Sequence, residues 1–310
     1  MNYSLEVITK GQQYLLLLAL IMGLSFLAKK TQVFIPVYEF IAKKVKSKRL
    51  VIALLSTLSG ILPIQGRCSV YAGALDTLAP CGHGKGKKQR ATYGVIDYLS
   101  THHYYFWSPL EATVLVPMAT LGITYRQFMG RMWPLLLTAV VVILYYIFRV
   151  LKEEDVDITF SKKKQTISWK QDKAQVVSYL RTLAFVSAVI MLGNLAKANS
   201  DSLSALVTFA HERNLLVLTA IGGFLASFAL GSSGKFAGIT SLSAGIFGIQ
   251  YLPLFFAIDY AGYMLSPSHK CLAITKSYFG TSAKEHYRAI FALVIPVVCV
   301  GILTYLTAGG

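Results

Sequence analysis

The 310-residue chain is 55% hydrophobic and only 14% charged, with a mean hydropathy of +0.55. Soluble domains carry about 25% charged residues, so this composition excludes a soluble domain held by a single anchor and predicts an integral membrane protein. The net charge of +16 does not indicate nucleic-acid binding, because the basic residues lie in short loops between apolar runs, as in the cytoplasmic loops of membrane proteins.

Apolar runs as long as a helical span, about 17 to 25 residues, recur along the chain and predict an all-α, polytopic bundle. The expected elements are, in order, a helix near 12–28, an amphipathic segment at 31–48, an interrupted apolar stretch at 50–80, a broken span at 92–122, a helix at 132–150, a polar loop at 151–175, a helix at 176–195, a second interrupted stretch at 214–249, a second broken span at 250–280 and a helix at 287–308. These elements form four units: 1–49, 50–150, 151–213 and 214–310.

The two interrupted stretches divide into halves that are too short to cross a bilayer comfortably: 50–62 and 69–80, then 214–230 and 236–249. The interruptions are "PIQGR" (Pro63–Arg67) and "GSSGK" (Gly231–Lys235). Irregular backbone at membrane depth is tolerated only where it is buried in protein or lines a cavity. We therefore expect two re-entrant helical hairpins rather than four spans.

The distribution of lysine and arginine predicts that these hairpins enter the membrane from opposite faces. Of the 30 basic residues, 20 fall in the loops that we place in the cytoplasm, which are 29–50, 81–92, 149–175 and 281–288. The first hairpin is then flanked by cytoplasmic loops, and the second enters from the other side. The turns of the two hairpins would point at each other.

A sparse internal repeat supports two opposed halves, although identity this low also arises by chance among apolar segments. At an offset of 158 residues, "YFWSPLEATVLVPMATLGITYR" (Tyr105–Arg126) superposes on "YMLSPSHKCLAITKSYFGTSAK" (Tyr263–Lys284), and at an offset of 168 Arg67 aligns with Lys235. The order hairpin, broken span and helix thus occurs twice, and the lysine and arginine distribution predicts opposite orientations in the membrane for the two copies. This inverted repeat is the arrangement that places transporter sites at the bilayer midplane.

The motifs resemble those of the ion-transporter superfamily, and within it the uncharacterised gluconate-permease-like integral membrane proteins. "GYMLSPSHKCLAITKSYFG" (Gly262–Gly280) is similar to their Ser-Pro-x-His-x-Cys-Leu-x-x-Thr-x-x-Tyr-Phe signature, while "HHYYFWSPLE" (His102–Glu111) and "GILPIQG" (Gly60–Gly66) are looser matches. The chain is shorter than typical members, and Arg67 stands where a small residue is expected. The resemblance implies a dimeric secondary transporter with two opposed hairpins that carries a small anion such as an organic acid.

The turns of the two hairpins are the candidate anion site. Helix termini expose backbone N–H groups and a positive dipole end, and each turn adds a cation directly after a glycine that permits close approach. The predicted substrate-binding residues of the turns are Gln65, Gly66, Arg67, Ser232, Ser233, Gly234 and Lys235. Alternatively, the two cations pair with Asp76, Asp97 or Asp259, or reach a membrane interface.

The Ser-Pro pairs at Ser108-Pro109 and Ser266-Pro267 complete the expected site. Proline lacks a backbone donor and frees a carbonyl one turn earlier, so an unwound helix there could bind Na⁺ or a substrate hydroxyl through Ser108 and Ser266; a simple kink is the alternative. The side chains assigned to the coupling ion or to a proton are Glu111, His269, Asp259 and Asp97. Glu111 and His269 could equally be structural partners of nearby basic residues.

Adjacent His102 and His103 point about 100° apart on a helix, so they bind a single metal poorly, and their aromatic surroundings indicate an interfacial belt instead. We expect no resident cofactor or metal, apart from Na⁺ or H⁺ as a coupling ion. The charged loop at 151–175 predicts a small hairpin or a contact with a partner protein. No nucleophile with a base indicates an enzyme.

The sequence therefore predicts a secondary active transporter of a small, carboxylate-bearing anion, coupled to Na⁺ or H⁺. We expect it as a homodimer in the inner, cytoplasmic membrane of a prokaryote, with no nucleic-acid partner. The alternatives are a non-transporting membrane subunit that anchors a larger complex, and an anion channel.

Overall fold

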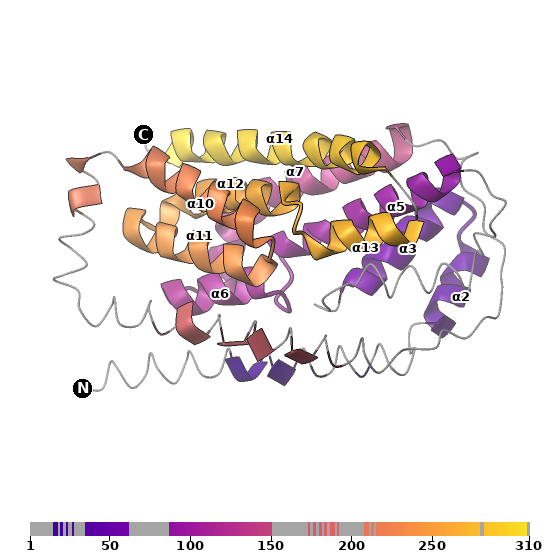
Figure 1. The fold of residues 1–310 in the computed structure, drawn as a ribbon, viewed down its shortest axis with the longest axis horizontal. Helices are drawn as coiled ribbons and strands as arrows, with labels where there is room; N and C mark the ends of the chain where they lie inside the picture. The colour runs from indigo at the N-terminus through magenta and orange to yellow at the C-terminus, as the bar shows by residue number, and fades with distance from the viewer. Residues whose placement is uncertain are drawn as a thin grey trace.

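The computed structural model describes residues 35–61, 87–150, 215–279 and 282–308, together with single residues and short runs between 15 and 27 and between 173 and 213. Every regular element in these ranges is a helix (Figure 1). The all-α class predicted from hydrophobic run lengths is therefore confirmed for the described residues. The first hairpin turn, the 151–175 loop and most of the predicted helices at 12–28 and 176–195 lie outside them.

The described helices fall into two groups along the chain. Those of the first half are α2 (Ile35–Lys44), α3 (Lys48–Gly60), α5 (Lys87–His102), the 3₁₀ turn η1 (His103–Phe106), α6 (Ala112–Leu121), α7 (Tyr125–Tyr145) and the π-helical turn η2 (Tyr146–Val150). Those of the second half are α10 (Leu216–Leu230), α11 (Ser233–Phe247), η4 (Ile249–Tyr251), α12 (Leu252–Leu265), α13 (Lys270–Phe279) and α14 (Ala283–Ala308).

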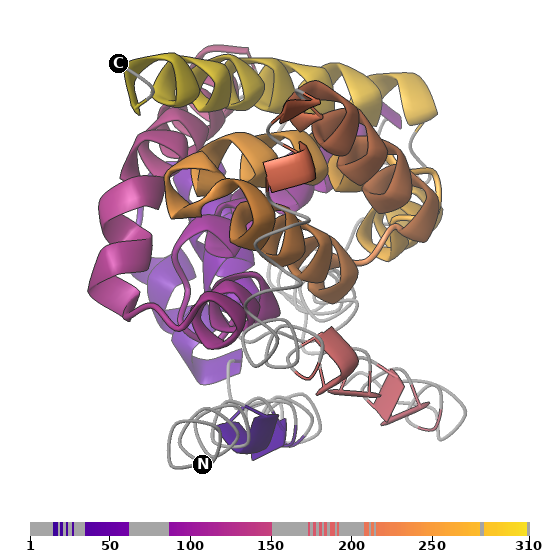
Figure 2. The ribbon, with the colours of Figure 1, turned by 90° about the vertical axis from the view of Figure 1, so that its left-hand side faces the viewer.

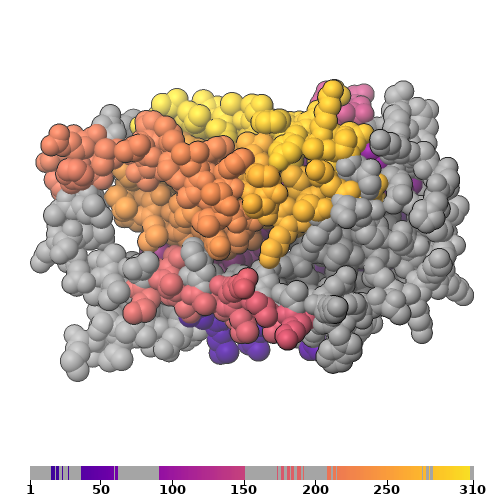
Figure 3. All heavy atoms as spheres, in the orientation of Figure 1, coloured from indigo at the N-terminus to yellow at the C-terminus, as the bar shows by residue number. Residues whose placement is uncertain are grey.

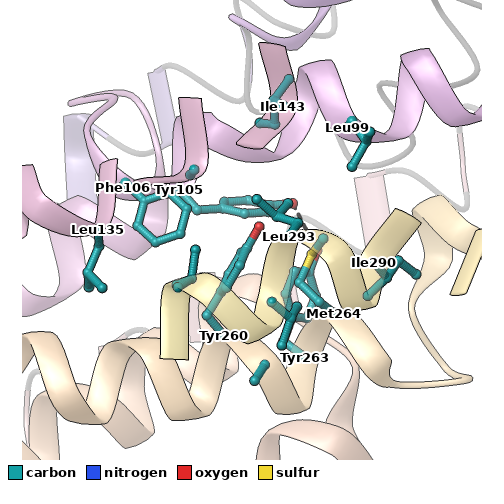
Figure 4. Packing of buried hydrophobic residues seen from close by; sticks show 14 of the residues in the cluster. Leu99, Tyr105, Phe106, Leu135, Ile143, Tyr260, Tyr263, Met264, Ile290 and Leu293 are labelled. Atoms are coloured by element: carbon teal, nitrogen blue, oxygen red, sulfur yellow. Dashed lines mark hydrogen bonds between the residues drawn. The ribbon is translucent and has the colours of Figure 1, made fainter. Parts of the chain in front are cut away.

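Helices α5 and α12 form the centre of the bundle. Every residue from Ala91 to His102 is buried, and α12 is buried over nearly its whole length. Figure 4 shows Tyr260 and Met264 of α12 packed among side chains of α5, η1, α7 and α14. A helix that is buried all round has no solvent-facing stripe, so polar residues on α5 and α12 must find partners inside the protein.

Helices α7 and α14 lie side by side and run in opposite directions along one edge of the molecule (Figures 1 and 2). The stretches Tyr125–Val150 and Ala283–Thr307 are long and apolar enough to cross a membrane, with mean hydropathies of 2.0 and 2.6. Only 28% and 33% of these hydrophobic windows are buried in the protein. Their outward faces are therefore apolar.

Both of these helices begin earlier than the sequence suggests. The predicted starts were 132 and 287, because polar residues near each start resemble a loop, but α7 begins at Tyr125 and α14 at Ala283. Thr124 and Gln127 form a capping box at α7, and Ser282 exchanges the same bonds with Glu285 at α14. A capping box satisfies two otherwise unpaired backbone donors and fixes the helix start.

Both predicted breaks are present. Helix α5 leads through η1 to an irregular segment at 107–111, and α12 ends at Leu265 before a turn at 266–269. The Ser108 hydroxyl accepts a hydrogen bond from the Leu110 backbone N–H at 3.3 Å, and the Ser266 hydroxyl accepts one from Ser268 at 3.1 Å. Each serine therefore replaces, within its own turn, part of the helical bonding that the following proline interrupts.

Helices α10 and α11 are joined by Gly231 and Ser232 alone and contact each other. Gly231 has φ of +53°, the left-handed conformation that ends many helices. In Figure 3 the orange side chains of this region lie beside the yellow ones of α13 and α14 on the face toward the viewer. The second interrupted stretch is thus two helices with a tight turn.

Candidate functional site

The turn between α10 and α11 is seated on the second helix break. A Cβ atom added to Gly231 would lie 2.8 Å from the Ser266 hydroxyl and 2.8 Å from the backbone carbonyl carbon of Ser268. Only glycine leaves room for this contact, and only glycine adopts the turn's φ without strain. Two irregular segments, 35 residues apart in sequence, thus share one contact.

The predicted anion-binding residues of the second turn directly follow Gly231 in sequence. Ser232 and Ser233 are half-buried at the start of α11, Gly234 is buried, and Lys235 is half-buried in the first turn of the helix. Ser266 is completely buried. Gln65, Gly66 and Arg67 of the first turn lie outside the described residues, so the predicted approach of Arg67 to Lys235 stays a prediction.

The first break lies near α11. Ser108 and Glu111 are buried there, and Glu111 is the N-cap residue directly before α6. Helix α6 packs along α11, with Ala112 and Val116 sharing an apolar cluster with Ala237. Helix α11 is therefore continuous with the turn at one end and covered by α6 along its side.

Asp97 of α5 is completely buried and holds three helices together. Its Oδ1 accepts a hydrogen bond from the Ser56 hydroxyl of α3 at 2.9 Å, and its Oδ2 lies 3.5 Å from the Thr275 hydroxyl of α13. Ser56 also donates to the Asp97 carbonyl at 3.1 Å. A carboxylate with hydroxyl neighbours is the kind of oxygen cluster that suits a hard cation.

Asp259 of α12 is also completely buried. Its Oδ2 accepts a hydrogen bond from the Thr240 hydroxyl of α11 at 2.6 Å. Its Oδ1 faces Gly223 of α10, where any side chain would collide with it, and has no hydrogen-bond partner in the described part of the chain. A buried polar atom left without a partner costs free energy, which makes this oxygen a candidate ligand for a cation or a proton.

The two aspartates occur in the same tripeptide, Ile-Asp-Tyr, at 96–98 in α5 and at 258–260 in α12. Asp97 faces α3, and Asp259 faces α10. The internal repeat at a fixed offset of 158 does not show this match, because that offset pairs Asp97 with Phe255. The offset between the tripeptides is 162. It exceeds 158 by four because Ser108 follows Tyr98 by ten positions, whereas Ser266 follows Tyr260 by six.

A second buried polar cluster gathers around His269, which precedes α13. Its Nδ1 lies 3.0 Å from the Tyr98 hydroxyl, and its Nε2 lies 3.3 Å from Nε2 of His102. The nearest ligand atoms of His102, His269 and Cys271 all lie within 4.8 Å of one another. Beside them, the hydroxyls of Tyr105 and Tyr263 are hydrogen-bonded at 2.8 Å.

This cluster corrects the predicted aromatic belt. His102, Tyr105 and Phe106 are fully buried in the core. Only His103 and Trp107 of residues 102–107 are half-exposed, as an interfacial belt would require, and their ring nitrogens are hydrogen-bonded at 3.0 Å. The adjacent histidines point apart, as expected, but His102 meets a histidine that is 167 residues away in sequence. Its partner could not be recognised from local spacing.

The seat of the turn yields a stability test. We expect Gly231→Ala to lower the melting temperature of the purified protein in detergent, because alanine adds a Cβ that collides at 2.8 Å and is strained at φ of +53°. Gly222→Ala is the matched control: it lies in the same helix with open space around it, and should stabilise by up to about 1 kcal/mol. Equal melting temperatures for the two variants would contradict the packed turn.

Comparison with known proteins adds one similarity. No curated protein matches the chain, and no solved structure matches it. Residues 171–308, which include α10 to α14 and therefore the turn, the second break, Asp259 and the His269 cluster, are similar to a protein family described as "Protein of unknown function (DUF401)".

Proposed function

We propose that this protein is a secondary active transporter, in a membrane, of a small carboxylate-bearing anion coupled to Na⁺ or H⁺. The observation that carries the proposal is the contact between the Gly231 turn and the Ser266 break. At this contact the end of α10 and the start of α11 lie against the buried Ser266 hydroxyl, and Lys235 follows in the first turn of α11, within a chain of membrane-like hydropathy. The substrate would bind at this contact.

The membrane location is supported by the outer faces of α7 and α14. Large apolar side chains project outward from both helices, among them Trp133, Leu137 and Val141 on α7, and Phe291, Ile295 and Leu303 on α14. In water, an apolar surface of this length would favour association. In a bilayer it is satisfied by lipid, and helices of this length match the hydrocarbon thickness.

The coupling role is supported by Asp97 and Asp259. Charged side chains in a membrane interior are costly and are retained where they serve ion or proton pathways. Both aspartates are buried, both lie beside hydroxyl groups, and each lies at an interface between helices. Either site offers oxygen ligands to Na⁺ or a carboxylate to a proton.

An inverted repeat is supported by the helix bounds. At the offset of 158, Ala112–Leu121 coincides with Lys270–Phe279, and the first residues of α7 and α14, Tyr125 and Ala283, also coincide, including their capping boxes. At the offset of 168, the starts of α3 and α10 coincide. We propose that the two halves are related by a two-fold axis.

The direction of the repeat is supported by contacts between corresponding residues. Tyr105 and Tyr263, which correspond at the offset of 158, are hydrogen-bonded to each other. Helices α7 and α14 correspond as well, and they lie side by side and antiparallel (Figure 1). A two-fold axis perpendicular to the helices brings corresponding elements together in this way. Under this proposal α3 begins a first re-entrant hairpin, as α10 and α11 form the second.

Substrate binding can be tested by uptake into liposomes that contain the purified protein. A panel of radiolabelled monocarboxylates, dicarboxylates and inorganic oxyanions should include a carboxylate whose uptake an inward Na⁺ or proton gradient accelerates. Lys235→Ala should raise KM for that carboxylate by roughly ten- to a hundredfold, because a charge-assisted hydrogen bond contributes about 1.5 to 3 kcal/mol. The exposed Lys284→Ala is the control and should behave as wild type.

The same assay separates the alternatives. A channel would give flux that no gradient of a second ion accelerates. A non-transporting subunit would give no flux of any compound in the panel. Either result with the wild-type protein would refute secondary transport.

Coupling can be tested separately from binding. Asp259→Asn removes the charge while retaining the size and the acceptor for Thr240. We expect this variant to lose acceleration by the gradient but to retain exchange of labelled for unlabelled substrate. Glu212→Gln, at an exposed position, should change neither. An Asp259→Asn variant that still accumulates substrate against its gradient would exclude Asp259 from coupling.

A further inference from the structure

We propose that His102, His269 and Cys271 form a binding site for a late first-row divalent cation such as Zn²⁺. The three residues come from two helices of different halves: His102 ends α5, His269 precedes α13, and Cys271 lies in the first turn of α13. Their ligand atoms lie within 4.8 Å of one another, and all three side chains are buried. This site does not depend on the transport proposal.

The ring of His102 is oriented by its Nδ1 atom. This nitrogen is hydrogen-bonded to the backbone carbonyl of Tyr98. A carbonyl oxygen can only accept, so Nδ1 must carry the proton, and in the neutral ring Nε2 is left with its lone pair. A metal-bound histidine is held in the same way, by a hydrogen bond from its other ring nitrogen that fixes the tautomer.

The ring of His269 is held in parallel fashion. Its Nδ1 lies 3.0 Å from the Tyr98 hydroxyl, and its ring packs against that of Tyr263 with centroids 4.2 Å apart. One residue, Tyr98, therefore holds both imidazoles, through its carbonyl and through its hydroxyl. Both Nε2 atoms are turned toward each other as a result.

The distances fit a tetrahedral metal. Two nitrogens that each lie about 2.0 to 2.1 Å from Zn²⁺ are roughly 3.4 Å apart, and the two Nε2 atoms are separated by 3.3 Å. A sulfur at about 2.3 Å from the metal lies roughly 3.6 Å from each nitrogen. From a spacing of at most 4.8 Å, the Cys271 sulfur would have to move closer by no more than about an ångström. The fourth position of the tetrahedron is left for a further donor.

The ligand set selects among metals. Two imidazoles and a thiolate are soft or borderline ligands, which favour Zn²⁺ and its neighbours over Mg²⁺ or Ca²⁺. The thiolate would also compensate part of the ion's charge in a buried environment. Lys270, which lies between His269 and Cys271 in sequence, is exposed. The competing explanation is that the two imidazoles share one proton and bind no metal.

The test uses the 310-residue chain in detergent, with Cys68, Cys81 and Cys299 replaced by serine, so that Cys271 is its sole thiol. Titration with Co²⁺ alone should give one bound ion per chain, with visible bands of tetrahedral Co²⁺ and a near-ultraviolet sulfur-to-cobalt band. Zn²⁺ should displace the Co²⁺. Absence of stoichiometric binding, as expected for a shared proton, would overturn the proposal.

Variants assign the ligands. Cys271→Ser, a substitution of similar size, should abolish the sulfur-to-cobalt band, and His102→Gln should weaken Co²⁺ binding roughly tenfold or more. His286→Gln, which changes another buried histidine outside the cluster, should retain full binding. Each variant is compared as the monodisperse fraction on size exclusion. A sulfur-to-cobalt band that persists in Cys271→Ser, or equal weakening by His286→Gln, would refute this ligand set.

Discussion

Two carboxylates in the centre of an apolar helix bundle must be solvated by the protein itself, because a buried charge without partners is very costly. Asp97 meets this requirement with hydroxyls from α3 and α13. Asp259 meets it only at Oδ2, with a hydroxyl from α11, because its Oδ1 lies against Gly223 of α10 without a hydrogen-bond partner among the described residues. Each aspartate thus fixes how its central helix packs against neighbours. The central helices in turn carry both breaks, so the site geometry depends on these two groups.

The irregular backbone of the bundle lies at the two helix breaks and at the Gly231 turn. Serine hydroxyls bond within their own turns at 108 and 266, and Gly231 lets another turn approach the second of them. The N-termini of α11 and α13, which begin next to this contact, would provide partial positive charge for the proposed anion. Under the proposed transport function, the outer helices, whose starts are capped at Thr124 and Ser282, would be the part against which the site moves. The buried histidine cluster joins the two halves at a different point.

The parts of this structure that local chemistry determines were predictable. Proline and glycine placed the breaks and the second turn within a few residues, and run lengths predicted an all-helical chain. The starts of α7 and α14 were missed, because basic residues next to a capping box resemble a loop. The shared Ile-Asp-Tyr tripeptide was missed because four extra residues change the offset. The partner of His102 lies 167 residues away, and no local pattern reports a contact at that distance.

The central claim is that the Gly231 turn and the Ser266 break enclose a substrate, and labelling of the turn tests it most directly. A single cysteine at Ser233, in protein whose four native cysteines are replaced, would be alkylated by a membrane-impermeant maleimide in liposomes. The account predicts that the transported carboxylate slows this alkylation, and slows it further when the coupling ion is present. An alkylation rate that neither the anion nor the ion changes would contradict a binding site at the turn.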